Sequence, residues 1–252
     1  MEKTKINVNL NHLHSVSRRR LSYTRMVMLL VGIQTFVSIA VTLSVSAIAY
    51  SIQNILKCIV IFTIIFTVIA DMSALSLLAI PKIRLLLPIN IIILSVYTIS
   101  ASIAVGLPFA CMNILWALTS WGTTFILFFS TVVGGASIRV DLMNYWRLLL
   151  AFLASEFIAT LITSLVLTTI GYLKVGMIVF GGGMAVIIII LAIIGGQKTF
   201  GQPGLRTIDP DYCLASIILH ANLLLLFIVS SVEFYYTLPR DPSKCKIEPT
   251  IL

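Results

Sequence analysis

Two acidic residues lie deep inside apolar stretches of the sequence, and each belongs to a run of hydroxyl side chains. Asp71 follows Thr63 and Thr67 at intervals of four residues, and Glu156 precedes Thr160 at the same interval. In a helix this spacing places the side chains on one face. A carboxylate at bilayer depth is costly and is a functional candidate by default. Because oxygen ligands suit hard cations, the two stripes predict a hydrated cation or proton path.

Less demanding interpretations exist for these polar groups. Ser and Thr often only bridge neighbouring helices, for about 0.6 to 2 kcal/mol each, and for the hydroxyls alone we favour that role. For Asp71 the alternative is a position near the membrane interface, paired with Lys82 or Arg84. Glu156 lies about nine residues inside its apolar run, so we expect it to face the interior of a helix bundle.

Other polar or small residues have simpler predicted roles. Glu233 stands beside two tyrosines near the end of an apolar run, which indicates an interfacial anchor. His220 has no acidic neighbour in the sequence, so we favour a hydrogen-bonding core residue over a proton carrier. The glycines at 181–183 and 195–196 predict close helix packing rather than a broken helix.

The elements that must position these residues are apolar segments long enough to cross a bilayer. Of the 252 residues, 59% are hydrophobic and only 10% are charged, which excludes an ordinary soluble domain. The uninterrupted runs exclude a β-barrel, whose strands alternate in polarity. We therefore predict an all-α membrane protein, a bundle of about seven transmembrane helices. The expected spans are roughly 26–48, 55–79, 86–107, 110–133, 146–171, 174–195 and 212–236.

The basic residues predict the orientation of this bundle. Twelve of the 17 Lys and Arg residues lie in the N-terminal tail and in the second, fourth and sixth loops, which places the N-terminus in the cytosol. This distribution also favours membrane topology over nucleic-acid binding as the reason for the net charge of +8. The predicted organisation is a basic cytosolic tail (1–25), a seven-helix transmembrane domain (26–236) and a short C-terminal tail (237–252).

One conflict remains in this topology. Seven spans send the C-terminal tail to the non-cytosolic side, although it carries Arg240, Lys244 and Lys246. A re-entrant seventh segment would resolve the conflict, since that segment also holds several polar residues. We favour seven full spans.

Nothing in the sequence has catalytic form. G-x-S-x-G, H-E-x-x-H, P-loop and C-x-x-C motifs are all missing, and the four cysteines lack metal-ligand spacing. We predict that the protein is not an enzyme, has no catalytic or metal-binding residues and needs no cofactor, with Ca²⁺ entering only as a permeant ion.

The order of several segments resembles the transmembrane Bax-inhibitor motif family, also called the lifeguard family. The similarity covers most of the chain: an arginine triplet before the first span, then 88–90 (PIN), 135–142 (GASIRVDL), 193–197 (IIGGQ), 211–216 (DYCLAS), 219–222 (LHAN) and 226–227 (LF). This resemblance implies a seven-helix protein of an endomembrane, the endoplasmic reticulum or Golgi. It also implies a pH-sensitive calcium leak that protects against cell death.

The resemblance also identifies what this chain lacks. The family's leak is associated with two aspartates on the last two helices that share a proton; here those positions are Gly195 and Asn222. The family's glutamate of the third helix falls at Ala101. We therefore expect a degenerate sensor, unless the alignment slips and Asp209 or Asp211 takes its place.

Three functional hypotheses remain open. The first is a calcium leak, or a regulator of calcium homeostasis and apoptosis. The second is a non-conducting membrane protein that modulates cell death or calcium signalling through membrane-protein partners. A seven-helix receptor is disfavoured because the loops are short and neither Asp-Arg-Tyr nor Asn-Pro-x-x-Tyr occurs.

Overall fold

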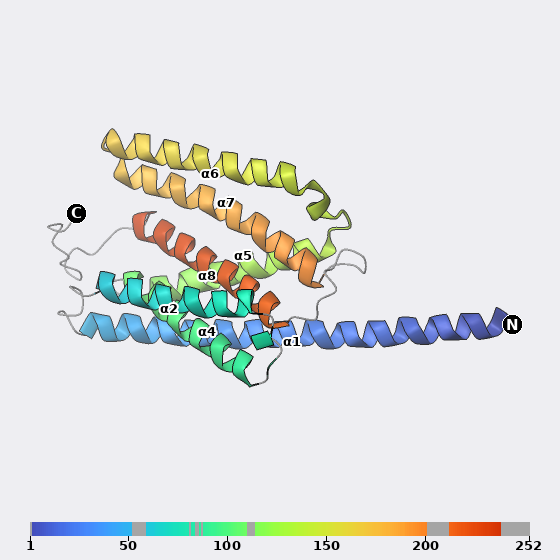
Figure 1. The fold of residues 1–252 in the computed structure, drawn as a ribbon. Coiled ribbons are helices and arrows are strands. Elements are labelled where there is room, and N and C mark those ends of the chain that lie inside the picture. The colour runs from blue at the N-terminus through green and yellow to red at the C-terminus, as the bar shows by residue number, and fades with distance from the viewer. Residues whose placement is uncertain are drawn as a thin grey trace.

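The computed structural model (Figure 1) contains only helices and their connections over the residues that it describes. These residues are 2–51, 59–80, 82–83, 86, 88–109, 114–200 and 212–237, with side chains placed from Tyr23 to Ile48 in the first range. The elements are α1 (Glu2–Ser51), α2 (Ile59–Ala79), α4 (Ile89–Gly106), η2 (Leu107–Phe109), α5 (Ile114–Ser137), η3 (Leu142–Tyr145), α6 (Trp146–Thr169), α7 (Leu173–Phe200) and α8 (Tyr212–Thr237).

Seven segments are long and apolar enough to cross a bilayer, which confirms the predicted all-α membrane fold. They are Tyr23–Ile48, Ile59–Ala79, Ile89–Phe109, Ile114–Ser137, Leu142–Thr169, Leu173–Phe200 and Tyr212–Thr237. The expected end points differ from these by five residues at most. Such shifts arise because the ends of a helix depend on capping and tertiary contacts more than on hydropathy.

The seventh segment is one unbroken helix of 26 residues, Tyr212–Thr237. It runs from the end of the bundle where α1 enters its span to the opposite end (Figure 1). A re-entrant segment would double back to the side where it began, so the structure favours seven full spans. The tail at 238–252 and the loop at 201–211, with Asp209 and Asp211, lie outside the described residues.

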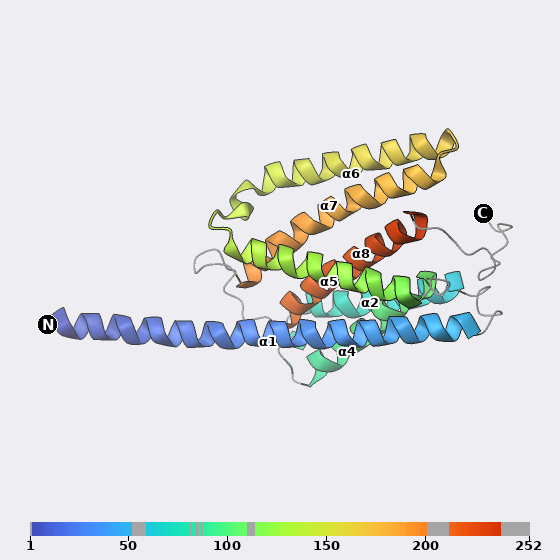
Figure 2. The same ribbon diagram turned by 180° about the vertical axis from the view of Figure 1, so that it is seen from behind.

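The predicted N-terminal tail is helical in the structure. α1 begins at Glu2 and continues without a break into the first span, which makes it a helix of 50 residues. The extension projects well beyond the other helices (Figures 1 and 2). Hydropathy alone marks where a span ends but does not show whether the helical backbone ends there too.

α8 lies at the centre of the bundle. About two-thirds (67%) of its most apolar stretch is buried by protein, compared with 6% for α2 and for α6. α8 packs against α7, α5 and α1, whereas α6 packs against α7 and α2 packs against α4. In both views α6 and α2 lie on opposite sides, with α7 and α8 between them (Figures 1 and 2). α2 and α6 therefore present most of their surface outward.

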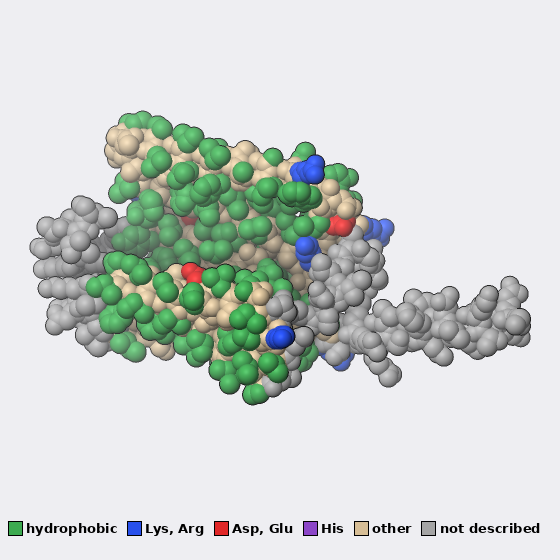
Figure 3. Space-filling model, in the orientation of Figure 1, with side chains coloured by type: hydrophobic (Ala, Val, Ile, Leu, Met, Phe, Trp, Pro, Cys, Tyr) green, Lys and Arg blue, Asp and Glu red, His purple; other side chains and the backbone are tan. Residues whose placement is uncertain are grey.

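The face shown in Figure 3 carries many hydrophobic side chains along the helices, and the basic side chains visible on it gather mainly at one end. That end, called the basic end here, is where α1 enters its span, α2 and α5 finish and α6 begins. The positive-inside rule leads us to expect the basic end in the cytosol. The basic end carries Arg25, Lys82, Arg139, Arg147 and Lys198, whereas Lys174 lies at the opposite end.

Glycines bring α5 and α7 into backbone contact. A Cβ atom added to Gly135 would lie 2.9 Å from the Cα of Ile193, and one added to Gly196 would lie 2.9 Å from the Cα of Val132. Gly183 likewise meets Thr160 of α6, where an added Cβ would lie 2.8 Å from the threonine Cβ. α7 is continuous through all its glycines, so the prediction of close packing is confirmed.

A candidate cation-binding cavity

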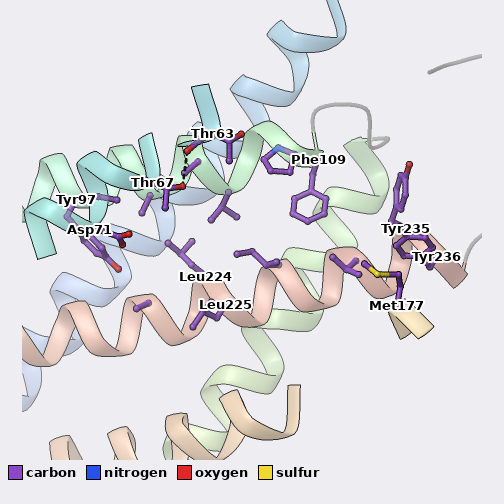
Figure 4. A pocket seen from close by; sticks show the side chains of 18 residues that line it. Thr63, Thr67, Asp71, Tyr97, Phe109, Met177, Leu224, Leu225, Tyr235 and Tyr236 are labelled. Carbon is purple, nitrogen blue, oxygen red and sulfur yellow. Dashed lines mark hydrogen bonds between the residues drawn. The ribbon is translucent and has the colours of Figure 1, made fainter. Parts of the chain in front are cut away.

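A cavity of about 710 Å³ lies between α2, α4 with η2, and α8, and Met177 of α7 closes one side of it (Figure 4). Most of its wall is apolar. Tyr235, Tyr236 and Phe109 stand at the end away from the basic end, and Asp71 and Tyr97 stand at the inner end (Figure 4). The cavity therefore extends from the end of the bundle opposite the basic end towards the middle of the bundle.

The stripe formed by Thr63, Thr67 and Asp71 lines this cavity, as the four-residue spacing predicts for one helix face. The hydroxyl of Thr67 donates to the Thr63 carbonyl oxygen over 2.8 Å. This bond is drawn in Figure 4 and lies within the helix, so the stripe does not bridge to another helix through it. Asp71 lies about 18 Å along the helix axis from the start of α2 and about 12 Å from its end, which is near the middle of this span.

Asp71 is the one charged side chain among the described residues of the cavity wall. The side chain is exposed rather than packed into the bundle. Tyr97 of α4, on which the carboxylate acts electrostatically, lines the same cavity. Figure 4 shows the two side chains together at the inner end. Asp71 lies about two turns of α2 before Ala79, and of its two suggested interfacial partners Lys82 lies beyond that end of α2 while Arg84 lies outside the described residues.

Glu156 occupies a different part of the molecule. It is half-buried on α6, on the side that carries Thr160 and Ser164 and faces α7. Glu156 therefore lies on the side of α6 that faces the other helices, but because α6 is an outer helix the residue is at the edge of the bundle and not at its centre. It does not line the cavity, and Thr160 bonds back to the Glu156 carbonyl oxygen over 2.8 Å. The two predicted stripes do not form one path.

A buried polar cluster lies behind Tyr97. The Tyr97 ring meets His220 of α8 edge-on, with 5.7 Å between ring centroids. His220 Nε2 lies 2.8 Å from Ser38 Oγ of α1, and Ser102 Oγ of α4 donates to Ser38 Oγ over 2.7 Å. His220, Ser38 and Ser102 have no exposed surface. His220 is thus a hydrogen-bonding core residue, as predicted, and it joins three helices.

Further polar pairs continue this cluster along the core. Gln34 donates to Thr98 over 3.1 Å, and Trp121 of α5 donates to Thr42 over 3.0 Å. These pairs were not predicted from the sequence, although the spacing of polar residues along α1 indicates them. On α1, buried polar residues recur every fourth position, at Gln34, Ser38, Thr42 and Ser46. That spacing predicts a polar seam facing other helices, since lipid offers such groups no partner.

Gly195 and Asn222 face each other across α7 and α8. A Cβ atom on Gly195 would lie 3.9 Å from Asn222 Nδ2 and 3.3 Å from a methyl group of Leu219. Ala101, where the resemblance places a glutamate, lines the cavity. The positions that the resemblance assigns to paired carboxylates are therefore neighbours in space.

Comparisons with protein-family models, with curated proteins and with solved structures found no match. The Bax-inhibitor resemblance therefore stays a prediction based on the residues quoted for it. The described residues also contain no group of three or more His, Cys, Asp or Glu side chains that could hold a metal ion.

Two residues of the segments that resemble the family, Gln197 and Asp141, form hydrogen bonds at the basic end. Gln197 of α7 is buried; its side-chain oxygen accepts from the Leu142 backbone N–H over 3.1 Å, and its amide donates to the Val140 carbonyl over 2.5 Å. Asp141 caps η3 by accepting from the Met143 backbone N–H over 2.9 Å. Gln197 thereby attaches the connection between α5 and α6 to the end of α7.

Glu233 was expected to be an interfacial anchor near the end of the last span. In the structure it is half-buried near the end of α8 and lies against α7, where a Cβ added to Gly181 would be 3.4 Å from its Cγ. It is not part of the cavity wall. The site that the structure assembles thus has one carboxylate, two threonines and three tyrosines, backed by the cluster around His220.

Proposed function

We propose that this multi-pass membrane protein mediates a slow leak of cations, Ca²⁺ foremost, across an endomembrane such as the endoplasmic reticulum or Golgi. The observation that carries the proposal is the mid-span carboxylate of Asp71 in a cavity that also presents Thr63 and Thr67. A carboxylate at this depth is costly, so its retention favours a role in cation binding.

The small number of oxygen ligands in the cavity wall favours passage of a cation over its tight binding. Ca²⁺ takes about six to eight oxygen ligands when it is bound tightly. The wall offers one carboxylate and a few hydroxyl and backbone oxygens, so an ion would stay largely hydrated and bind weakly. Weak binding is compatible with passage through a membrane.

The far side of the cavity explains why such a leak would be slow. Tyr97 and Ala101 form its inner wall, and the bonded side chains of Ser38, Ser102 and His220 lie behind Tyr97. An ion would have to separate this cluster to reach the basic end. The proposed leak is therefore closed in this conformation and opens only through rearrangement at the cluster.

The resemblance to the Bax-inhibitor motif family supplies the cellular part of the proposal. It supports a role in calcium homeostasis and in protection against cell death, with membrane proteins of those pathways as partners. The facing positions of Gly195 and Asn222 support the alignment behind this resemblance.

Ca²⁺ entry into liposomes that contain the purified protein tests the proposal. We expect a small flux from the wild type and a several-fold lower flux from Asp71→Asn. The matched control is Glu156→Gln, which removes the other mid-span carboxylate outside the cavity and should conduct as the wild type does. Folded protein without flux would overturn the leak and leave the non-conducting interaction protein as the alternative. Equal flux from Asp71→Asn and wild type would remove Asp71 from the path.

A further inference from the structure

The cavity wall combines an extended apolar surface with a single negative charge at its inner end. We propose that this cavity binds a hydrophobic amine from the bilayer, with the ammonium group at Asp71 and the hydrocarbon chain along α8. The proposal concerns the same cavity as the cation leak, but it requires binding only and does not depend on conduction.

The apolar part of the site is built mainly by one face of α8. Leu224, Ile228 and Val232 follow each other at intervals of four residues and line the cavity together with Leu225. Met177 and Phe109 complete the wall (Figure 4). The volume of about 710 Å³ lies within the usual range for small-molecule sites, which are mostly apolar with a few placed polar groups.

The charge decides the class of occupant. Asp71 is the one acidic side chain of the described part of the wall, which contains no Lys, Arg or His beside it. An ammonium group would supply the missing positive charge in a medium of low polarity, where an unpaired carboxylate is costly. The Tyr97 ring beside Asp71 adds an aromatic surface of the kind that attracts organic cations. A neutral or anionic lipid would gain neither interaction.

The way in is from the side of the bundle. α2 buries only 6% of its most apolar stretch, and Leu225 and Tyr235 of the cavity wall are 41% and 38% exposed. The hydrophobic face of the molecule is interrupted by acidic atoms over α2 (Figure 3). An amphiphile dissolved in the bilayer can therefore reach the cavity laterally.

Binding of radiolabelled dodecylamine to the purified protein in nanodiscs tests the proposal, with uptake by empty nanodiscs subtracted. We expect saturable binding of one molecule per chain, displaced by dodecyltrimethylammonium and not by dodecanol, which has the same chain without the charge. Asp71→Asn should weaken binding by at least about tenfold, the loss of one charge-assisted contact. Glu156→Gln should bind as the wild type does.

A second variant keeps the test decisive if Asp71→Asn fails to fold. Leu225→Trp leaves the carboxylate in place but fills the apolar part of the cavity, so it should also lower the affinity by several-fold. Circular dichroism and gel filtration report folding. Uptake no greater than in empty nanodiscs, equal displacement by dodecanol, or unchanged affinity in a folded Asp71 or Leu225 variant would each overturn the proposal. Because no ion flux is measured, the leak can fail while amine binding stands.

Discussion

Gly195 of α7 and Asn222 of α8 are placed so that a side chain on the first would reach the amide of the second: an added Cβ would lie 3.9 Å from Asn222 Nδ2. Neither residue carries a titratable group. We therefore expect any leak to vary little between about pH 6 and 8, the range in which a carboxyl pair can act as a switch.

The double variant Gly195→Asp with Asn222→Asp would place two carboxylates at these facing positions. Such a pair titrates as a unit, and its charge would change in separate steps. We expect the double variant to give a flux that depends on pH, and each single variant to do so less. The measurement is liposome flux at several pH values. Steep pH dependence in the wild type, unchanged in the double variant, would contradict this prediction.

Gly135 tests the backbone contact between α5 and α7. Gly135→Ala should destabilise the protein by about 1 to 3 kcal/mol, because the new methyl group would meet the Ile193 backbone and the two helices would have to separate. The adjacent Gly134 has no heavy atom within 4 Å of an added Cβ, so Gly134→Ala is the matched control. Thermal unfolding of both variants in the same detergent measures the difference. Equal loss in the two would contradict the close approach.

The bond between His220 and Ser38 predicts an energetic coupling between α8 and α1. In a double-mutant cycle with His220→Ala and Ser38→Ala, we expect a coupling of about 0.5 to 2 kcal/mol, the scale of polar contacts between membrane helices. Pairing Ser38→Ala with Thr160→Ala on the outer helix α6 should give additive effects. Additivity in the first cycle as well would mean that the bond contributes no net stability.

The seven-span arrangement predicts that the two termini lie on opposite sides of the membrane, with the N-terminus cytosolic. Epitope tags at each end can be tested by protease treatment of intact microsomes. The N-terminal tag should be cleaved, and the C-terminal tag should be protected until detergent is added. Cleavage of both tags in intact vesicles would contradict the orientation despite the seven helices.

Hydropathy predicts the helices of this protein well because each span must satisfy its own backbone hydrogen bonds within lipid. The four-residue spacing predicted that Asp71 shares a helix face with Thr63 and Thr67, and all three line the cavity. Only the local chain is needed for that conclusion. Hydropathy and residue spacing do not predict which helices lie next to one another.

Glu156 and the cluster around Ser38 show what local reasoning omits. The cost of a lipid-facing carboxylate predicted that Glu156 faces other helices, but this cost does not determine which helix lies at the edge of the bundle. In the structure α6 lies at the edge of the bundle, and Glu156 is half-buried on its α7-facing side. Ser38, Ser102 and His220 look unremarkable separately, since each is a common helix-bridging residue. Their meeting depends on the crossing of α1, α4 and α8.

The shallow burial of α2 has a consequence for how this protein changes during evolution. Because only 6% of its most apolar stretch is buried by protein, exchanges among Ile, Leu, Val and Phe at the exposed positions of that helix should be close to neutral. Homologous sequences should therefore diverge rapidly along α2 while keeping its hydrophobicity. Persistence of an acidic residue at position 71 against that drift would be a signature of selection for binding.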